Sequence, residues 1–299
     1  MPPQNITETS HSRGPTPLLD SNHQLVVPTP TRPPTTLFEL FLFRVLFPTL
    51  GPLFLSYKCI TDSFFRKTIG SVYTLVSSAT SQPVSNEWYF QDKSLLSRLW
   101  TMESAKCYLN DQGEPQLEYQ LREGYCGSAT QRCVLKSLGY INVREQKGGE
   151  SKPQLWCEHV TEMARESCHG AKEEVVLDTT IVEGGVSYEE FVKAIRDGLG
   201  NKNCRIACNF LRPALMGFAG WRIFPMNFLL GMMGGHFSPI LGMLDVEEVD
   251  SPLVAIWDTN HKYNGAYFVP AKRLYDAVHA VDLSAHKHRA LILVTKKGL

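Results

Sequence analysis

The chain has 299 residues, of which 43% are hydrophobic, and 30 basic and 30 acidic residues give it a formal net charge of zero. This length and apolar content suit one domain of ordinary size with its own core plus an extension, and the absence of a basic stripe argues against a nucleic-acid-binding protein. The eight cysteines show no paired pattern, which in a domain of this size indicates a reducing compartment.

The N-terminal 60 residues differ in composition from the rest of the chain. Residues 1–36 are rich in Pro, Thr and Ser and poor in apolar residues, and we expect them to be disordered. Residues 37–60 include a densely apolar run, residues 37–57, that is long enough to span a bilayer but contains two charges and two prolines. An interfacial anchor or a segment packed on the domain is the alternative. The long polar segment in front of this run argues against an ordinary cleaved signal peptide.

Two helices are expected in the middle of the chain. The run that follows Cys126 has apolar residues at helical spacing and ends near Gly139. Ser187 and Glu190 form a capping box, which begins a helix that runs to about Leu199.

The C-terminal part of the chain has the pattern of short strands with one further helix, residues 271–281. The apolar runs of strand length are residues 204–210, 237–244, 253–257 and 291–294. The acidic, turn-like residues 245–252 join the second and third of these runs, so we expect those two to pair as an antiparallel hairpin. The sequence therefore predicts a mixed α+β domain over residues 71–299.

Three residues in chain order suggest a thiol active site of the papain type. Cys126 lies at a predicted helix start, His236 lies 110 positions later near the start of the predicted hairpin, and Asp258 lies at its end. The thiolate is the reactive form of cysteine. A neighbouring imidazole can take the thiol proton, a helix N-terminus lowers the thiol pKa further, and an acid fixes the imidazole tautomer. A lone buried cysteine is more often a core residue, so the surrounding sequence has to decide between these two interpretations.

The surrounding sequence resembles that of the phytochelatin synthase family. The matching segments are Tyr-Cys-Gly-Ser-Ala at residues 125–129, Gly-Gly-His-Phe-Ser-Pro-Ile at residues 234–240, and Trp257-Asp258 followed by Val269-Pro270. Gln120 matches a family glutamine that resembles the oxyanion-hole glutamine of papain. The resemblance implies a papain-like cysteine protease fold. In that fold a helical half carries Cys126, and an antiparallel sheet half carries His236 and Asp258.

The resemblance also implies an activity, that of a glutathione gamma-glutamylcysteinyltransferase which makes phytochelatins for heavy-metal detoxification. Cys126 would attack the Cys-Gly bond of glutathione, and glycine would leave with a proton from His236. The gamma-Glu-Cys acyl-enzyme would pass its acyl group to a second glutathione or a growing phytochelatin. Gln120 and the backbone N–H of Cys126 would stabilise the oxyanion. The expected substrate-binding residues are Arg212, Gly235 and His261.

No organic cofactor and no metal site formed by the protein itself is expected. The resemblance implies that heavy-metal ions such as Cd and Zn act as activators through thiolate complexes of glutathione. Cysteine and histidine residues whose spacing fits no closed zinc pattern are Cys157, His159, Cys168 and His169. Cys133 lies two helical turns after Cys126 and is expected to pack in the core.

Two alternatives to the transferase remain. The family usually has an arginine at the position of His261, and its absence keeps open a thiol hydrolase (peptidase) that removes Gly from glutathione or its S-conjugates. The other alternative is an inactive, membrane-tethered binding module. The expected partners are glutathione and phytochelatins, with no nucleic acid and with membrane contact through residues 37–57. If residues 37–57 span a membrane, the basic residues after this run favour a cytoplasm-facing catalytic domain; they are Lys58, Arg66 and Lys67.

Overall fold

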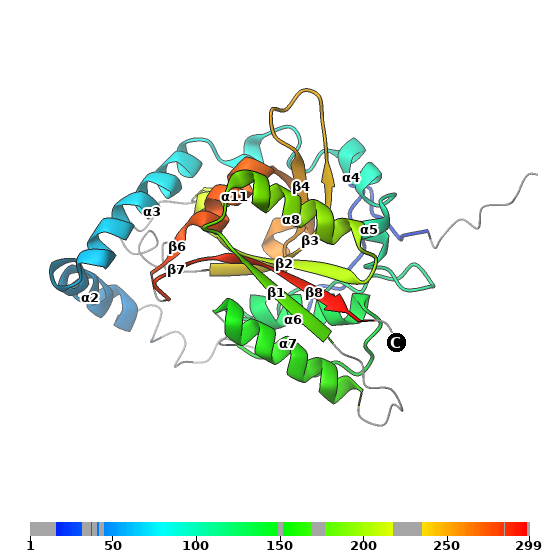
Figure 1. Ribbon diagram of the computed structural model, residues 1–299, viewed down its shortest axis with the longest axis horizontal. Coiled ribbons are helices and arrows are strands. Elements are labelled where there is room, and N and C mark those ends of the chain that lie inside the picture. The colour runs from blue at the N-terminus through cyan, green and yellow to red at the C-terminus, as the bar shows by residue number, and fades with distance from the viewer. Residues whose placement is uncertain are drawn as a thin grey trace, which may run out of the picture.

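A six-stranded antiparallel sheet with the strand order β1-β8-β2-β3-β4-β5 forms the centre of the computed structural model (Figure 1). The structure describes residues 16–31, 37, 41, 45–148, 152–168, 177–217, 235–283 and 285–297. The strands of the sheet are β1 (Leu177–Glu183), β2 (Cys204–Leu211), β3 (Gly235–Leu244), β4 (Leu253–Trp257), β5 (Ala266–Pro270) and β8 (Ala290–Lys296). The short strands β6 (Val281–Asp282) and β7 (Lys287–His288) form a separate pair.

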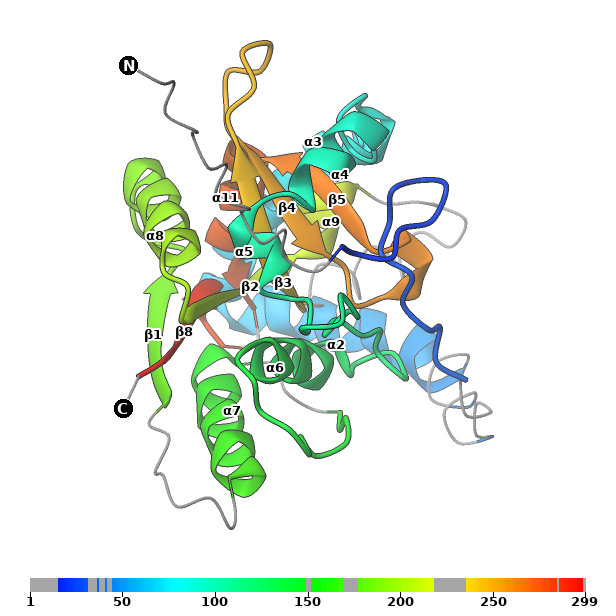
Figure 2. The ribbon, with the colours of Figure 1, turned by 90° about the vertical axis from the view of Figure 1, so that its right-hand side faces the viewer.

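Helices cover both faces of the sheet. Helices α8 (Tyr188–Gly200) and α11 (Ala271–His279) pack on one face, and α6 (Cys126–Ser137) and α7 (Pro153–Ser167) pack on the other (Figures 1 and 2). The remaining helical elements are α2 (Phe47–Thr61), α3 (Ser63–Ser81), η2 (Val84–Asn86), α4 (Lys93–Leu99), α5 (Glu103–Lys106), α9 (Arg212–Met216) and η3 (His261–Tyr263). Because the central strands are covered on both sides, every residue of β2 and β4 is buried. The domain is therefore α+β in class, as the sequence predicts.

The predicted helix boundaries are confirmed at α6 and α8. Helix α6 begins at Cys126 and ends before Gly139, whose φ of +84° lies in the region that favours glycine. At the start of α8, Ser187 Oγ accepts a hydrogen bond from the Glu190 N–H at 3.2 Å, and Glu190 Oε2 accepts one from the Ser187 N–H at 3.0 Å. This reciprocal pair is the predicted capping box.

The predicted hairpin is formed by β3 and β4. These strands pair antiparallel, with Ile240 opposite Ile256 and Leu244 opposite Leu253. Strand β3 begins at Gly235, two residues earlier than predicted, because its first residues pair with β2. The start of β3 therefore lies beside the end of β4. Helix α6 packs on β3, so the beginnings of α6 and β3 and the end of β4 are brought together.

A short N-terminal segment packs against the edge strand β5. The Gln24 side chain donates to the Ala266 carbonyl at 2.7 Å and accepts from the Ala266 N–H at 2.9 Å, and the His23 carbonyl accepts from Trp100 Nε1 at 2.9 Å. The expectation that residues 1–36 are disordered therefore needs correction for this segment, because the amide of Gln24 supplies hydrogen-bond partners for the edge of the sheet. Residues 1–15 and 32–36 lie outside the described part of the chain.

The apolar run expected at residues 37–57 is described in part. Helix α2 covers it from Phe47 onward and forms, with α3, a helix pair at one end of the molecule (Figure 1). Within the ranges that the structure describes, no helix is long and apolar enough to cross a membrane.

Candidate active site

Cys126 is the first residue of α6, and its neighbours hold this helix start in place. The chain enters the helix after Gly124, whose φ is +82°. Trp156 Nε1 donates to the Gly127 carbonyl at 3.0 Å, and Ser128 Oγ donates to the Lys147 carbonyl at 2.7 Å. Because the first N–H groups of a helix have no partner within it, the Cys126 thiol lies at the positive end of α6.

His236 lies beside this thiol, on the second residue of β3. Burial by itself raises the pKa of the Cys126 thiol, but the charge of His236 and hydrogen bonds from His236 and from the Phe237 N–H bring that pKa below its ordinary value. Burial and Arg212 lower the pKa of His236, whereas Asp258 and Cys126 raise it, and the net shift is upward. The two shifts favour a thiolate–imidazolium pair.

Asp258 directly follows β4 and is completely buried. Its Oδ1 lies 3.0 Å from His236 Nε2 and accepts the Asn260 N–H at 2.8 Å, and its Oδ2 accepts the Tyr267 hydroxyl at 3.1 Å. Burial raises the pKa of this carboxyl, but Arg212 and His236 outweigh burial and lower the pKa to about 2. Since Nε2 of His236 faces Asp258, Nδ1 is the ring nitrogen that remains for the thiol.

Arg212 pairs with Asp258 in the structure. It is the first residue of α9, its Nη2 lies 2.5 Å from Asp258 Oδ1 and also contacts His236 Nε2, and its guanidinium lies over the Tyr263 ring at 4.4 Å. Arg212 is expected from the sequence to bind substrate. Here the guanidinium compensates a buried protein carboxylate, which without a partner would be costly to hold in the ionised form.

The other buried cysteines lack this environment. Burial is the main cause that raises the thiol pKa of Cys133, Cys157, Cys204 and Cys208, the value for Cys157 being about 11. All eight cysteines lie in the described ranges and are free thiols. Cys126 is thus the buried cysteine whose thiol pKa is lowered, and the expectation that Cys133 is a core residue is confirmed.

Gln120 is held next to Asp258 through the backbone. The Gln120 N–H donates to the carbonyl of Thr259 at 2.7 Å, and its side-chain Nε2 donates to Glu123 Oε2 at 3.3 Å. The side chain is buried, and its Oε1 has no hydrogen-bond partner among the residues described. The Gln120 amide, which is expected from the sequence to stabilise an oxyanion, therefore belongs to a segment that is hydrogen-bonded to the residue after Asp258. Its Oε1 makes no hydrogen bond to the described residues.

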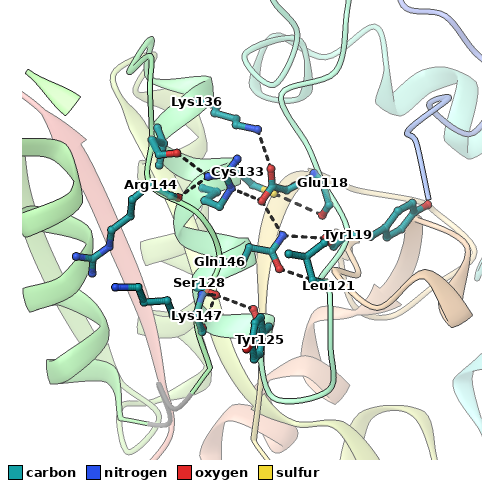
Figure 3. A network of polar contacts seen from close by, with 12 residues as sticks. Glu118, Tyr119, Leu121, Tyr125, Ser128, Cys133, Lys136, Arg144, Gln146 and Lys147 are labelled. Atoms are coloured by element: carbon teal, nitrogen blue, oxygen red, sulfur yellow. Dashed lines mark hydrogen bonds and ion pairs between the residues drawn. The ribbon is translucent and has the colours of Figure 1, made fainter. Parts of the chain in front are cut away.

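A polar network fixes the segment that carries Gln120 (Figure 3). The Gln146 side chain accepts a hydrogen bond from the Leu121 N–H at 2.9 Å and donates one to the Tyr119 carbonyl at 2.9 Å. It therefore binds the backbone of both residues that flank Gln120. The Glu118 carboxylate accepts from Gln146 Nε2 at 2.8 Å, and from Arg132 Nε at 2.5 Å and Lys136 Nζ at 2.7 Å, both on α6. The network links Gln120 to the helix that begins with Cys126.

Gly235 lies against a buried charged cluster that the sequence does not predict. A Cβ added at Gly235 would stand 2.3 Å from Nη1 of Arg289, so a side chain there has no room. Arg289 Nη1 donates to Asn209 Oδ1 at 3.1 Å and lies 3.4 Å from Asp282 Oδ2, and all three side chains are buried. Arg289 Nε and Nη2 and Asn209 Nδ2 have no hydrogen-bond partner within the described part of the structure. The one signal in the sequence is an arginine that directly precedes a fully apolar strand, Ala290 to Val294.

His261 lies on the far side of the Gln120 segment, in η3. Its ring stands edge-on to Tyr119 at a centroid distance of 6.4 Å. Together with Tyr119 and the N-terminal segment around Gln24, it lines a cavity of about 660 Å³. The residues that line this cavity do not include Cys126, His236, Asp258 or Gln120, so the structure does not bring His261 together with the other predicted site residues there.

No metal site is formed by the described residues: none of their His, Cys, Asp and Glu side chains gather in a group of three or more that could hold an ion. Cys157 and His159 lie on α7, and Cys168 caps its C-terminal end. His169 lies outside the described ranges.

A comparison with protein families gives one match. The family model of phytochelatin synthase matches residues 89–291, about two thirds of the chain, and this range contains every site residue described above from Tyr119 to Arg289. No curated protein gives a match to this chain.

Proposed function

Because the chain belongs to the phytochelatin synthase family, we propose that it is a glutathione gamma-glutamylcysteinyltransferase with Cys126 as its nucleophile. The family implies an acyltransferase that uses glutathione. The observation that carries the assignment of the nucleophile is the pKa of the Cys126 thiol, which is lowered while those of Cys133, Cys157, Cys204 and Cys208 are raised. We further propose that the fold is papain-like, since a helix that begins with the cysteine packs on an antiparallel sheet that carries the histidine and the acid.

The first half-reaction forms an acyl-enzyme. The Cys126 thiolate attacks the carbonyl carbon of the Cys-Gly bond of glutathione, and a tetrahedral intermediate with an oxyanion forms. The C–N bond then breaks, the glycine nitrogen takes a proton from His236, and gamma-Glu-Cys remains on Cys126 as a thioester. Asp258 holds the His236 ring in position and stabilises its protonated form, which its hydrogen-bonded, ionised carboxylate allows.

The oxyanion would be stabilised by the backbone N–H of Cys126 and the side-chain amide of Gln120. The first N–H groups of α6 have no partner inside the helix, and among the described residues Gln120 Nε2 makes one long hydrogen bond of 3.3 Å, to Glu123. Each such donor contributes about 3 kcal/mol to transition-state stabilisation. The network of Glu118 and Gln146 would hold the amide at the required position.

In the second half-reaction an amine attacks the thioester. The amino group of a second glutathione, or of a growing phytochelatin, gives its proton to His236 and forms the new amide bond, while Cys126 leaves as a thiolate. If water attacks in place of the amine, the product is free gamma-Glu-Cys. The balance between transfer and hydrolysis therefore depends on how well the site holds the amine acceptor.

We propose that the buried cluster of Arg289, Asn209 and Asp282 binds the amino-acid head group of a gamma-glutamyl chain. Two nitrogens of Arg289 and Nδ2 of Asn209 are buried donors without partners among the described residues, a set suited to a carboxylate. The Asp282 carboxylate beside them suits an ammonium group. The cluster borders Gly235, which precedes His236, so a substrate held there would lie next to the proposed catalytic histidine.

Metal dependence is proposed to enter with the substrate. The described residues form no metal site, and a soft ion such as Cd²⁺ or Zn²⁺ bound by glutathione thiolates would reach the enzyme as part of the substrate complex. On this proposal the product serves heavy-metal detoxification in the cytoplasm, where glutathione is present and thiols stay reduced.

A thiol hydrolase that removes glycine from glutathione or its S-conjugates is the second candidate. It is favoured by His261, which occupies the position of the arginine usual in the family. An inactive binding module is less well supported, because the pKa shifts of Cys126 and His236 are those of a reactive ion pair.

The deciding experiment incubates the full chain with glutathione, with and without Cd²⁺ or Zn²⁺, and follows the products by mass spectrometry. Gamma-Glu-Cys oligomers that disappear in C126A and persist in C133A would support the transferase. Glycine release without oligomers would move the assignment to the hydrolase. If glutathione is not turned over with any of these additions, the inactive binding module becomes the favoured assignment.

A further inference from the structure

Helix α2 carries a stripe of large apolar side chains that face solvent. Leu50, Leu53, Phe54, Tyr57 and Ile60 are related by spacings of three and four residues (50 to 53 and 54, 53 and 54 to 57, 57 to 60), so they share one face of the helix. These side chains are between 51% and 76% exposed. A stripe of this kind on a globular protein ordinarily faces the core, and here it faces away from the protein.

The orientation of the stripe is determined by α3. The opposite face of α2, with Gly51, Pro52 and Cys59, is partly buried and turns toward the protein. Helix α3 is anchored in the domain through Phe65, Thr68, Val72, Val76 and Ala79, which are all buried. The α2–α3 pair stands at one end of the molecule (Figure 1). The exposure of the stripe side chains shows that the stripe faces outward.

Basic residues lie next to the stripe, on α2 and at the start of α3. Lys58 lies on α2, and Arg66 and Lys67 lie exposed in the second turn of α3. Between residues 45 and 86 the sequence contains a single acidic residue, Asp62. Its carboxylate accepts the Phe65 N–H at 3.0 Å and lies 3.8 Å from Lys58 Nζ. An apolar helix face next to an excess of basic residues is complementary to a lipid surface with anionic head groups.

We propose that α2 docks in the plane of an anionic membrane surface, with its outward stripe among the lipid acyl chains and Lys58, Arg66 and Lys67 at the head groups. Tyr57 in the stripe suits the boundary between the two layers. A helix of 15 residues is about 22 Å long, which suits an in-plane position better than a crossing of a hydrocarbon core of about 30 Å. This proposal does not depend on the proposed catalytic function.

The test is flotation of the full chain with vesicles of phosphatidylcholine alone and of phosphatidylcholine with 30 mol% phosphatidylserine, a composition of about physiological charge. We expect binding to the anionic vesicles and a loss of at least about tenfold in the triple variant Leu53→Ser, Phe54→Ser, Ile60→Ser. The triple variant Lys58→Gln, Arg66→Gln, Lys67→Gln should lose the preference for anionic over neutral vesicles.

Matched controls distinguish docking through α2 from non-specific hydrophobic binding to vesicles and from misfolding of the variant. Ile141→Ser and Trp88→Ser remove exposed apolar side chains, 73% and 58% exposed, outside the helix pair and should bind vesicles like the wild type. Circular dichroism and the thermal unfolding midpoint of the stripe variant should match those of the wild type, because its side chains are exposed. No binding by the wild type, or undiminished binding by the stripe variant, overturns the proposal. A wild-type dimer in solution that the stripe variant breaks would assign the stripe to a second copy of the chain instead.

Discussion

Helix α6 contains two buried cysteines seven residues apart, and their thiols have opposite pKa shifts. Burial raises the pKa of both. At Cys126 the charge and hydrogen bond of His236 more than offset burial, whereas at Cys133 the carboxylate of Glu118 adds to it. Residue type, helix and burial are shared by the two sites. The sign of the neighbouring charge therefore decides which thiol is poised to react.

The two neighbourhoods also differ in how the thiol is hydrogen-bonded. Cys133 Sγ accepts the Glu118 N–H at 3.2 Å and faces the Glu118 carbonyl at 3.8 Å, an arrangement suited to a neutral thiol. Cys126 lies at the helix N-terminus and next to an imidazole whose pKa is raised. Substitutions near one of the two cysteines at a time should therefore have different effects.

The largest effect is expected from replacing each thiol in turn. C126A should lower the rate of glycine release from glutathione by at least about 1,000-fold, because it removes the proposed nucleophile. C133A should keep the rate within about threefold, since it removes only one atom from the core. Comparable losses in the two variants would contradict the assignment of Cys126. Steady-state kinetics with mass-spectrometric detection measures both.

Next in size is the effect of removing the imidazole. In H236N burial remains but the charge partner is gone, so the pKa of Cys126 should rise above its ordinary value, and alkylation by iodoacetamide at pH 6 should slow by about 100-fold. In the wild type the thiolate–imidazolium pair exists at pH values above the lowered pKa of Cys126 and below the raised pKa of His236. The rate of glycine release should therefore have a bell-shaped pH profile, with its acid limb set by Cys126 and its alkaline limb set by His236. Alkylation of Cys133 in the same sample is the internal control, and an unchanged rate at Cys126 would disprove the pairing.

Removing the acid should reduce activity and remove a pH-dependent contribution to stability. D258N should lower kcat by at least about 100-fold through loss of the His236 orientation. Because the pKa of Asp258 is about 2 in the folded protein and 3.8 is its ordinary value, its contribution is present above about pH 4 and is lost as pH falls toward 2. The unfolding free energy of the wild type should therefore exceed that of D258N by about 2 kcal/mol at neutral pH, and this difference should shrink below pH 4.

Denaturant unfolding between pH 2 and 7 measures this difference. D276N serves as the control, because the Asp276 carboxylate pairs with Lys272 on the surface of α11 and should have little effect at any pH. If the difference in unfolding free energy between the wild type and D258N grew as the pH was lowered, the pH dependence would be opposite to the prediction. That result would show that Asp258 is not an ionised, paired carboxylate in the folded protein.

The smallest effect is expected on the Cys133 side of helix α6. In E118Q the anchors to Arg132 and Lys136 weaken, and the Gln120 segment becomes less precisely held. We expect a decrease in kcat of about tenfold with little change in KM, because an oxyanion donor acts in the transition state. E114Q, which removes an exposed carboxylate of the same segment, is the matched control. A rise in KM with unchanged kcat would assign Glu118 to substrate binding instead.

The elements that carry the proposed site residues could be predicted because their local signals lie within short stretches. The helix start at Cys126, the capping box at Ser187 and the hairpin from His236 to Asp258 each depend on residues close together in the chain, and the structure confirms all three elements. The family followed from short segments as well, and the match over residues 89–291 confirms it.

Other features depend on which segments pack together, and the sequence pattern does not contain that information. Arg212 was interpreted as a partner for substrate, but the fold turns it to Asp258. Gln24 belongs to a stretch of disorder-prone composition, yet it completes the edge of β5. Asp282 and Arg289 lie seven residues apart, but Asn209 comes from a segment 80 residues before Arg289, so no local pattern reveals their cluster.

The sequence by itself determined helices α6, α8 and α11, strands β2, β3, β4 and β8, the α+β class and the residue types available for thiol chemistry, because backbone preferences and hydrophobic periodicity act over a few residues. Only the tertiary structure decided which cysteine has a lowered pKa, which carboxylate Arg212 pairs with, and that the stripe of α2 faces outward. Burial and charge pairing depend on the neighbours that distant segments bring together, and electrostatic shifts fall off over a few ångströms in space rather than along the chain.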